Sequence, residues 1–445
     1  MSKMQIQIGM DDIDSPVGGC TTHFASILVE RLNKWSVEWT DYPNLIRLNP
    51  GIPYRTRGNG AVALHFEVEG MDIDDIISLV EKQVNDYVDK DYPNTNPGVV
   101  VLEGKLPRQV VNLSRLALWR VVPIALAKRI IETCSIPYFT GGNGRGLIGA
   151  LSSVGNSLHE DHTYEYIAYR SLKDCNRERG VDAKSVIKMD KEMGNRVFSN
   201  VDQSTGRIMV EPHGQDPVLY GIRGEQAEFV IRAGQKVKSK QAVDRWMVFR
   251  SNQGTGEHLK HRVEIMNLRP YMAALVKGMV VSKPRMIEGG HVIFSIEDKS
   301  GRVDCAAYEP SGEFREVVMK LIVGDIVCVH VGVRPASRTH GLTLNLEGLE
   351  VIEISKASVL SNPICPVCNK RMKSAGKAKG FKCVKCGYKD SEIDKTETEL
   401  VRNLSRGLYL PPARAQRHLT RPLARIERNN NSLSREIVAK WHSHG

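Results

Sequence analysis

The sequence predicts a multidomain α+β protein, in which an N-terminal strand–helix body precedes an OB-fold β-barrel and a zinc ribbon. Three observations predict this class. Strand and helix periodicities alternate near the N-terminus, short β runs fill residues 271–354, and two CxxC pairs follow Pro363. A length of 445 residues allows about three domains.

The N-terminal body is predicted from its apolar spacing. Apolar side chains alternate or run together in its predicted strands, residues 4–10, 62–68 and 98–103. They recur at helical spacing in its predicted helices, residues 20–35, 73–84 and 110–133. Pro123 should kink or restart the last helix, and residues 136–155 are glycine-rich.

The barrel is predicted from five short β runs, AALVKGMVV, HVIFSIED, RVDCAAYE, DIVCVHVGVRP and LTLNLEGLEVIEI. An amphipathic stretch, Phe314–Ile322, lies between the third and fourth runs. Five strands with a helix in that position follow the order of an OB-fold. Another small β-barrel is the alternative.

Four cysteines carry the strongest motif. Two CxxC pairs fourteen residues apart suit a tetrahedral, structural Zn²⁺ site, with Gly387 in the tight turn after the second pair; the ligands would be Cys365, Cys368, Cys383 and Cys386. An iron–sulfur cluster or a redox pair is the alternative. The odd total of nine cysteines argues against a disulfide framework.

The positive charge is confined to the C-terminal fifth. Residues 362–445 hold 18 basic and 7 acidic residues, which accounts for the whole net charge of +11. This pattern favours a polyanion-binding part. After residue 395 several arginines are three or four residues apart, which predicts a basic helical face; a solvated tail is the alternative. No long apolar run or signal peptide is visible, so we expect a cytoplasmic protein without a membrane span.

An acidic loop follows the first strand. Three clustered carboxylates repel one another, and Mg²⁺ with nucleotide phosphates would relieve that repulsion. The residues behind them sit where a helix should begin, and glycines, free amides and hydroxyls there suit phosphate. The sequence therefore predicts an ATP–Mg²⁺ site without a Walker motif, from Asp11, Asp12, Asp14, Gly18, Gly19, Thr21 and Thr22. A helix-capping, Asp-rich turn is the alternative.

Two later segments carry weaker signals. In FTGGNGRGLIGA, Gly144 would let a ligand approach the backbone and Arg145 could clamp a phosphate or carboxylate. The segment VDQSTGRIMVEPHGQDPVLYGIRG gathers polar groups such as Asp202, His213 and Asp216. A carboxylate there could bind a small cation, although hairpin turns explain the composition better.

These features together closely resemble the archaeal tRNA-Ile agmatidine synthetases (the TiaS family), in the same order from residue 4 to about 390. The resemblance is carried by the segments GMDDIDSPVGGCTT, FTGGNGRGLIGA, EPHGQDPVLYGIRGE and SNQGTGEHL, followed by the OB-like region and the ribbon. The resemblance implies an ATP-dependent, tRNA-modifying ligase. It would join agmatine to C2 of the wobble cytidine in the CAU anticodon of isoleucine tRNA, forming agmatidine and allowing AUA decoding. The implied partners are that tRNA and agmatine, with no obligatory protein partner.

The resemblance also implies a domain order. A kinase-like ATP-binding domain would begin at 1–110, a ferredoxin-like domain would occupy 111–190, and the catalytic body would resume at 191–262. The OB-fold would span 268–356, the zinc ribbon 362–392 and a basic tail 395–445.

Residue roles follow from the same resemblance. Asp11, Asp12 and Asp14 would act in catalysis with Mg²⁺–ATP, and Thr21 would be a site of phosphorylation. The residues implied for agmatine binding are Asp202, His213 and Gly214. One departure is visible, because the family commonly has threonine where this chain has Ile13.

The implied chemistry suits the residues. The C2 oxygen of cytosine is a poor leaving group, and phosphorylating it lets an amine displace phosphate. The protein must then hold ATP, an extruded base and an amine together. Two other functions remain open from the sequence: a non-catalytic OB/zinc-ribbon nucleic-acid-binding protein, and an ATP-dependent kinase without amine transfer.

Overall fold

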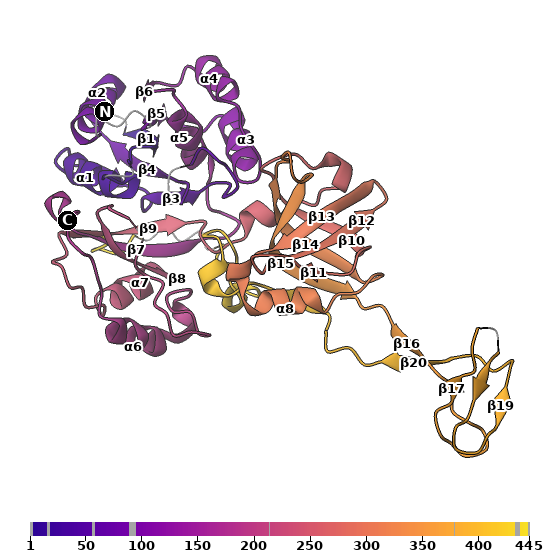
Figure 1. The fold of residues 1–445 in the computed structure, drawn as a ribbon. Coiled ribbons are helices and arrows are strands. Elements are labelled where there is room, and N and C mark those ends of the chain that lie inside the picture. Colours follow the sequence, from indigo (N-terminus) through magenta and orange to yellow (C-terminus); the bar gives the residue numbers. More distant parts are fainter. Residues whose placement is uncertain are drawn as a thin grey trace.

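The structure is a computed structural model, which describes residues 3–15, 18–55, 58–88, 95–212, 214–377, 379–431 and 437–443. Figure 1 shows a layered α/β body, a β-barrel beside it, and a small ribbon that projects away on a two-stranded stalk.

The helices are α1 (Thr21–Asn33), α2 (Ile73–Tyr87), α3 (Arg108–Ala117), α4 (Ile124–Thr133), α5 (Gly146–Gly155), α6 (Ala183–Met193), α7 (Ala227–Gly234) and α8 (Glu313–Met319). The strands of the body are β1 (Met4–Asp11), β2 (Glu38–Trp39), β3 (Asn44–Arg47), β4 (Gly60–Val68), β5 (Gly98–Glu103), β6 (Tyr138–Thr140), β7 (Thr163–Tyr169), β8 (Val218–Gly224) and β9 (Arg245–Ser251). Those of the barrel are β10 (Ala273–Val280), β11 (Arg285–Met286), β12 (Val292–Asp298), β13 (Gly301–Ala307), β14 (Ile326–Arg334) and β15 (Thr343–Glu353). The stalk, ribbon and return strands are β16 (Ala357–Ser361), β17 (Lys373–Ser374), β18 (Phe381–Lys382), β19 (Lys389–Asp390), β20 (Thr396–Leu400) and β21 (Gly407–Tyr409).

One sheet runs through the whole α/β body. Its strand order over the described residues is β6-β5-β1-β4-β3-β9-β7-β8, with β2 against β4. The halves meet where β3 and β9 pair in parallel, at Asn44 with Arg250 and at Leu45 with Ser251. The two halves therefore share a continuous sheet, and loops from both reach the site described below.

The strand alternation places helices on both faces of the first half of the sheet. Ile6, Ile8 and Met10 of β1 are fully buried in one core with α1 and α2. Val100 and Leu102 of β5 point to the opposite face, where α3, α4 and α5 form a second core. Figure 1 shows these helix groups on opposite sides of the sheet, which confirms the predicted strand–helix body. Pro123 precedes α4 and restarts the predicted long helix there.

The domain boundary differs from the predicted one. Residues 108–155 form α3, α4, β6 and α5, which pack on the first half of the sheet rather than starting a ferredoxin-like domain at 111. The second half begins at β7 and continues through α6, β8, α7 and β9 to Ser251, so residues 191–262 complete the second half and contact the first half through the pairing of β9 with β3. The reason is burial: the apolar faces of α3 and α5 find their core against β4 and β5.

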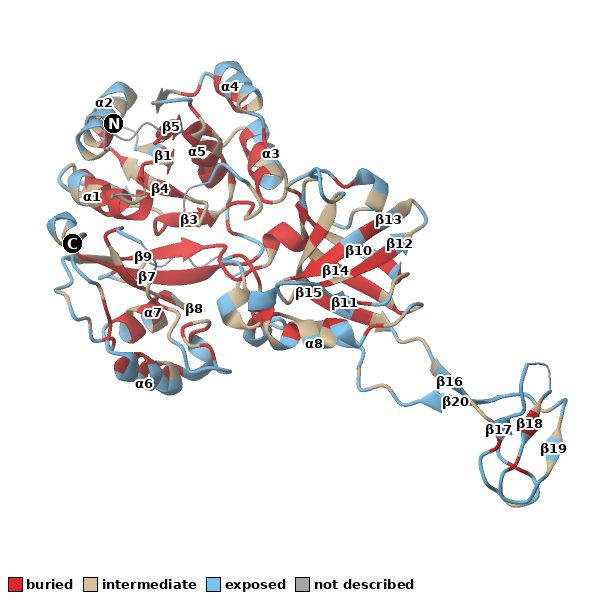
Figure 2. Ribbon diagram, in the orientation of Figure 1, coloured by how far each residue is buried: buried red, intermediate tan, exposed pale blue. Residues whose placement is uncertain are grey.

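The barrel confirms the OB-fold prediction. Strand pairings close five strands in the order β10-β12-β13-β15-β14, and β14 returns to β10. Helix α8 lies between β13 and β14, as the sequence predicted. Figure 2 shows the buried barrel core, and the mostly exposed ribbon beyond it.

The C-terminal segment does not form the predicted basic helix. Its described residues contain short strands and 3₁₀ turns, and it passes back over the barrel and the α/β body. Several of its arginines pair with buried acids: Arg402 with Asp325, Arg414 with Asp202, Arg421 with Asp161, and Arg425 with Asp161 and Glu225. Their charge is neutralised inside the protein, so these arginines are not the free polyanion-binding tail that composition suggested.

No helix within the described residues is both long and apolar enough to cross a membrane.

Candidate functional site

The acidic loop lies at the end of β1, inside the body. Asp11 is the last residue of β1, and Asp12 adopts a left-handed conformation with φ of 56°. One oxygen of Asp12 accepts a hydrogen bond from Asn96 Nδ2 at 3.2 Å, whereas Asp12 Oδ1 is buried without a partner. Burial, and then the charge of Asp14, raises the pKa of Asp12 to about 6. A buried carboxylate with an unsatisfied oxygen is suited to a cation.

Asp11 is still more enclosed. Burial, and then the charge of Asp12, raises the pKa of Asp11 well above its ordinary value. Its carboxylate lies against α5, where a Cβ on Gly149 would be 1.8 Å from Asp11 Oδ2. The glycines that suggested a ligand loop therefore let α5 approach the acidic loop.

Asp11, Asp12, Arg145 and Gly149 line a small cavity of about 80 Å³. Gly144, predicted to contact phosphate, lies in the turn before α5 with φ of 79°. The Arg145 guanidinium stacks over the Tyr54 ring at 3.9 Å.

A second, larger cavity of about 560 Å³ faces the start of α1 and is lined by Asp14, Cys20, Thr21 and Thr22. Thr21 Oγ1 lies 3.5 Å from Asp14 Oδ1. Cys20 makes no side-chain cap, so its side chain does not occupy the first amides of α1, and the N-terminus of a helix favours an anion. The two cavities share Leu48 and Arg55, so the predicted catalytic residues border adjoining spaces.

The remaining predicted phosphate ligands shape this helix start. Gly18 exchanges backbone hydrogen bonds with Ser15, and Gly19 has a φ of 71°. Ile13, in place of the family threonine, is 2% exposed and packs in the core with α1, so it offers no hydroxyl to a nucleotide. The Ile13 backbone N–H donates a hydrogen bond to Thr21 Oγ1 at 3.4 Å.

The three aspartates do not converge on one point. Among the described residues, two sets of three or more potential metal ligands bring their ligand atoms within 4.8 Å of one another, and the aspartates form neither set. One is the cysteine group, and the other is Cys328, His330 and Glu350 on the barrel. Mg²⁺ commonly binds one or two protein carboxylates together with substrate phosphates. Asp12 with one neighbouring aspartate therefore fits a Mg²⁺ site, whereas the three aspartates, which all lie within the described residues, do not form a cage of three carboxylates.

Asp202 and Gly214, two of the residues predicted to bind agmatine, are not among the residues that line the large cavity. Asp202 is 2% exposed and accepts hydrogen bonds from Arg414 Nη1 at 2.8 Å and from Ser204 Oγ at 2.6 Å. Burial by itself would raise the pKa of Asp202, but the hydrogen bonds from Ser204 and Arg414 outweigh it, so the pKa is lowered. Gly214 has a φ of 128°, its carbonyl accepts a hydrogen bond from Arg179, and His213 is outside the described residues.

The first part of this segment forms a turn, which the composition also suggested. Gly206 N–H bonds back to the Asp202 carbonyl, and Val201 pairs with Ile208. Asp202 therefore opens a hairpin turn.

Sequence analysis missed a group of cations on the large cavity. We call Arg47, Arg55, Arg223, Arg417 and His418 the arginine cluster. They come from three distant chain segments, so no local motif could reveal them. The one available signal was the polar loop SNQGTGEHL: Gln253 Oε1 accepts a hydrogen bond from Arg47 Nε at 3.1 Å, and Asn252 holds the Arg47 backbone.

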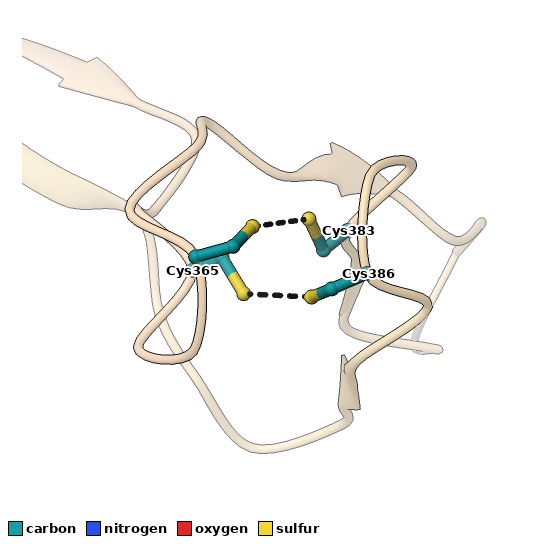
Figure 3. A group of neighbouring side chains, drawn as sticks. Cys365, Cys383 and Cys386 are labelled. Atoms are coloured by element: carbon teal, nitrogen blue, oxygen red, sulfur yellow. Dashed lines mark hydrogen bonds between the residues drawn. The ribbon is translucent and has the colours of Figure 1, made fainter.

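The four cysteines of the predicted zinc site lie together, and Figure 3 shows three of them labelled. The Cys365 and Cys386 sulfurs are 3.5 Å apart, and those of Cys368 and Cys383 are 3.4 Å apart. Tetrahedral Zn–S bonds of about 2.3 Å would set sulfurs about 3.8 Å apart, close to this arrangement. The Cys386 amide, with that of Lys385, lowers the pKa of Cys383 to about 6, so its thiolate is favoured. Gly387 has a φ of 81°, as the tight turn requires.

Comparisons with known proteins cover nearly the whole chain. Family models match as the TiaS TCKD domain over residues 7–141, the TiaS FLD domain over 144–258, an OB-fold nucleic acid binding domain over 274–352, and the TiaS C-terminal zinc ribbon domain over 362–404. The first two models meet just before α5, well beyond the predicted break at 111 and close to the start of the second half of the sheet.

Two relatives carry the same description, a 2-agmatinylcytidine synthetase, TiaS, of an isoleucine tRNA. The protein of Staphylothermus marinus is 42% identical over 98% of this chain and 97% of its own length. That of Archaeoglobus fulgidus is 40% identical over 95% and 98%.

Solved structures agree with these relatives. The complex of TiaS with its isoleucine tRNA and ATP is 38% identical with a TM-score of 0.85, over 95% of this chain and 98% of that one. The complex of TiaS with the same tRNA, AMPCPP and agmatine is 36% identical with a TM-score of 0.83, over the same shares.

Proposed function

The chain belongs to the TiaS family of 2-agmatinylcytidine synthetases, which act on an isoleucine tRNA, and from that premise we propose that it joins agmatine to C2 of the wobble cytidine in the CAU anticodon of isoleucine tRNA, using ATP. One structural observation carries the proposal beyond the likeness. The acidic loop and the start of α1 border adjoining cavities, the larger of which is also lined by residues of the second half of the sheet. A nucleotide, an extruded base and an amine have room to meet there.

The chemistry has two stages. Transfer of a phosphoryl group from ATP to the C2 oxygen breaks a phosphoanhydride bond of ATP, whose other fragment leaves, and forms a P–O bond to the base. The C2 oxygen then becomes part of a good leaving group. The agmatine amine then forms a bond to C2, the C2–O bond breaks, and phosphate leaves with its oxygen. The first amides of α1, which the Cys20 side chain does not cap, would stabilise negative charge on phosphate during both stages.

Mg²⁺ is part of the proposal. Asp12 would hold it, together with Asp11 or Asp14, since Asp12 has a buried oxygen with no hydrogen-bond partner. When bound with ATP, the ion would neutralise phosphate charge. Gly144 and Arg145, at the turn before α5, would contact the nucleotide, and Thr21 would be the residue phosphorylated in this chain.

Agmatine carries a guanidinium group, and Asp202 already binds one, that of Arg414. We assign Asp202 to agmatine through exchange with Arg414, whose side chain lines the large cavity. Removing Arg414 should then lower KM for agmatine, whereas Asp202→Asn should raise it. If both variants keep the wild-type KM, the guanidinium binds elsewhere, and cavity acids such as Glu211 and Asp216 become the candidates.

The zinc ribbon and the OB barrel would bind the tRNA, because the ribbon carries eight lysines and arginines within residues 362–390. A cytoplasmic protein would meet both this tRNA and ATP.

Transfer of labelled agmatine tests the function directly. The full chain is incubated with ATP, Mg²⁺, labelled agmatine and the CAU isoleucine tRNA transcript, with elongator methionine tRNA, which shares the anticodon, as the control. We expect ATP-dependent label in the isoleucine tRNA alone. ATP consumption without label would instead support a kinase, and tRNA binding with neither would support a nucleic-acid-binding protein.

A further inference from the structure

The arginine cluster holds more positive charge than its partners neutralise. Arg47 Nη2 and Arg223 Nε each lie 3.5 Å from a different oxygen of Glu165. These two cations therefore share one carboxylate. Arg417 adds a third cation, and it has no ion pair within 4.0 Å among the residues that the structure describes.

The arginines around His418 disfavour a positive charge on its ring. The positive charge of Arg47, then desolvation of the ring, then the charges of Arg223, Arg55 and Arg417 hold the pKa of His418 well below its ordinary value, although the residue keeps an exposed surface on the cavity wall. Its Nδ1 lies 3.5 Å from Arg223 Nη2. A proton on this ring would add a further positive charge beside the arginines, whereas an anion would reduce the repulsion among them.

The cluster is also pre-positioned. Asn252 and Gln253 are almost fully buried and fix Arg47 through its backbone and its Nε. Arg223 is anchored beside Glu165, which is 4% exposed. Held guanidinium groups lose little freedom on binding, and their planar donors suit phosphate oxygens.

The location ties the cluster to the reaction. Arg47 is close enough to Cys20, the residue before α1, for the two side chains to interact electrostatically. The cluster and Thr21 line the same cavity, and Arg55 borders both cavities. An anion in this cavity would be within the influence of both the guanidinium groups and the positive end of the α1 dipole.

We propose that the arginine cluster is a phosphate-binding site of the large cavity. The phosphate has two possible sources: the phosphoryl group in transfer to the base, or the RNA backbone phosphate beside the wobble nucleotide. The choice between these two sources rests on the proposed function. The preference of the site for phosphate rests on the arginine cluster itself.

The test uses the full chain and the double variant Arg55→Ala/Arg417→Ala, because both residues are exposed on the cavity wall and outside the apolar cores. The matched control is Arg177→Ala, whose side chain is 77% exposed and which does not line either cavity. Inorganic phosphate is the first probe. We expect it to raise the Tm of the wild type and of the control, and to leave the Tm of the double variant unchanged.

Two further measurements identify the source. If the phosphoryl group in transfer is bound, the modification rate falls by about tenfold to a hundredfold per arginine, with tRNA affinity unchanged. If a backbone phosphate is bound, tRNA affinity falls and the slope of log K against log salt decreases by about 0.7 per lost contact. Equal behaviour of the double variant and the control in all three measurements would overturn the proposal.

Two additions keep the outcome interpretable. Should the double variant fail to fold, Arg417→Lys keeps the charge but loses the planar donors, and it should lose part of the phosphate effect. Agmatine incorporation by the wild type is measured in the same preparations. If the wild type incorporates agmatine but the cluster variants behave like the control, the phosphate-binding role of the cluster is refuted and the proposed function is not. If the wild type does not incorporate agmatine, the proposed function is refuted.

Discussion

Asp161 should hold the C-terminal segment on the α/β body. It is 1% exposed and accepts hydrogen bonds from Arg421 Nη2 at 2.7 Å, from Arg425 Nη2 at 3.0 Å, and from the Asn430 backbone at 2.8 Å. Asp161→Asn removes the charge while keeping the shape. The Arg425 side chain, fully buried, would then depend on Glu225 alone for its counter-charge.

The size of the effect follows from this burial. Removing one partner of a buried ion pair costs about 3–5 kcal/mol. Because Glu225 remains 2.8 Å from Arg425 and the new amide still accepts one bond, we expect the lower end, about 3 kcal/mol. At about 2–4 °C per kcal/mol, the Tm should fall by about 6–12 °C.

The assay combines thermal unfolding with limited proteolysis and agmatine incorporation. The segment carries Arg414, Arg417 and His418 to the large cavity, so the variant should expose residues 411–431 to protease and lose activity. Asp174→Asn is the matched control, because its pair with Arg177 is at the surface, and it should change the Tm by about 2 °C or less. An Asp161→Asn protein with the Tm and protease pattern of the control would refute the argument that this pair docks the segment.

Three further predictions concern the acidic loop and the ribbon. Asp12→Asn should abolish agmatine transfer but leave tRNA binding intact in a gel-shift assay. In the wild type, Mg²⁺ affinity should fall as the pH falls through about 6, because protonation of Asp12 removes the charge of the ligand. Gly149→Ala should reduce transfer at least tenfold, since its methyl would lie 1.8 Å from Asp11 Oδ2, whereas Gly301→Ala, 3.5 Å from its nearest neighbour, should be tolerated. Zinc removal by a chelator, or Cys368→Ser, should unfold the ribbon and weaken tRNA binding, while ATP-induced thermal stabilisation persists because the ribbon lies apart on its stalk.

Each of these three has an opposing result. Near-normal transfer by the Asp12 variant would exclude the metal role assigned to it. Equal activity of the two glycine variants would show that α5 can shift away from the acidic loop. Unchanged tRNA affinity after zinc loss, verified by metal analysis, would remove the ribbon from the tRNA-binding surface.

Local sequence patterns predicted a structural feature correctly where a single chain segment forms it. The alternation of Ile6, Ile8 and Met10 predicted a buried strand, because side chains of a strand alternate between faces. The spacing of the four cysteines predicted the zinc site, since both ligand pairs lie in short knuckles. The OB-fold was likewise visible as five short β runs with a helix between the third and fourth.

Local patterns failed where packing decides. The glycine-rich stretch at 146–155 became a helix, because its glycines allow close contact with β1 and β5 instead of serving a loop. The predicted break at 111 was misplaced, since α3 needs the core beside β5. The acidic loop was recognised, but its carboxylates turn toward two different cavities.

The sequence by itself determined the first strands and helices, the barrel strands, the zinc ligands, the acidic loop and the family of this protein, because each depends on residues close together in the chain. The tertiary structure alone decided what the arginines do. Arg414, Arg421 and Arg425 looked like a polyanion-binding tail, yet they pair with acids 200 or more residues away. Arg47, Arg223 and Arg417 looked unrelated, yet they meet at one cavity. Charge is a property of the sequence, but whether a charge is neutralised or left for a ligand depends on which distant groups the fold brings within a few ångströms.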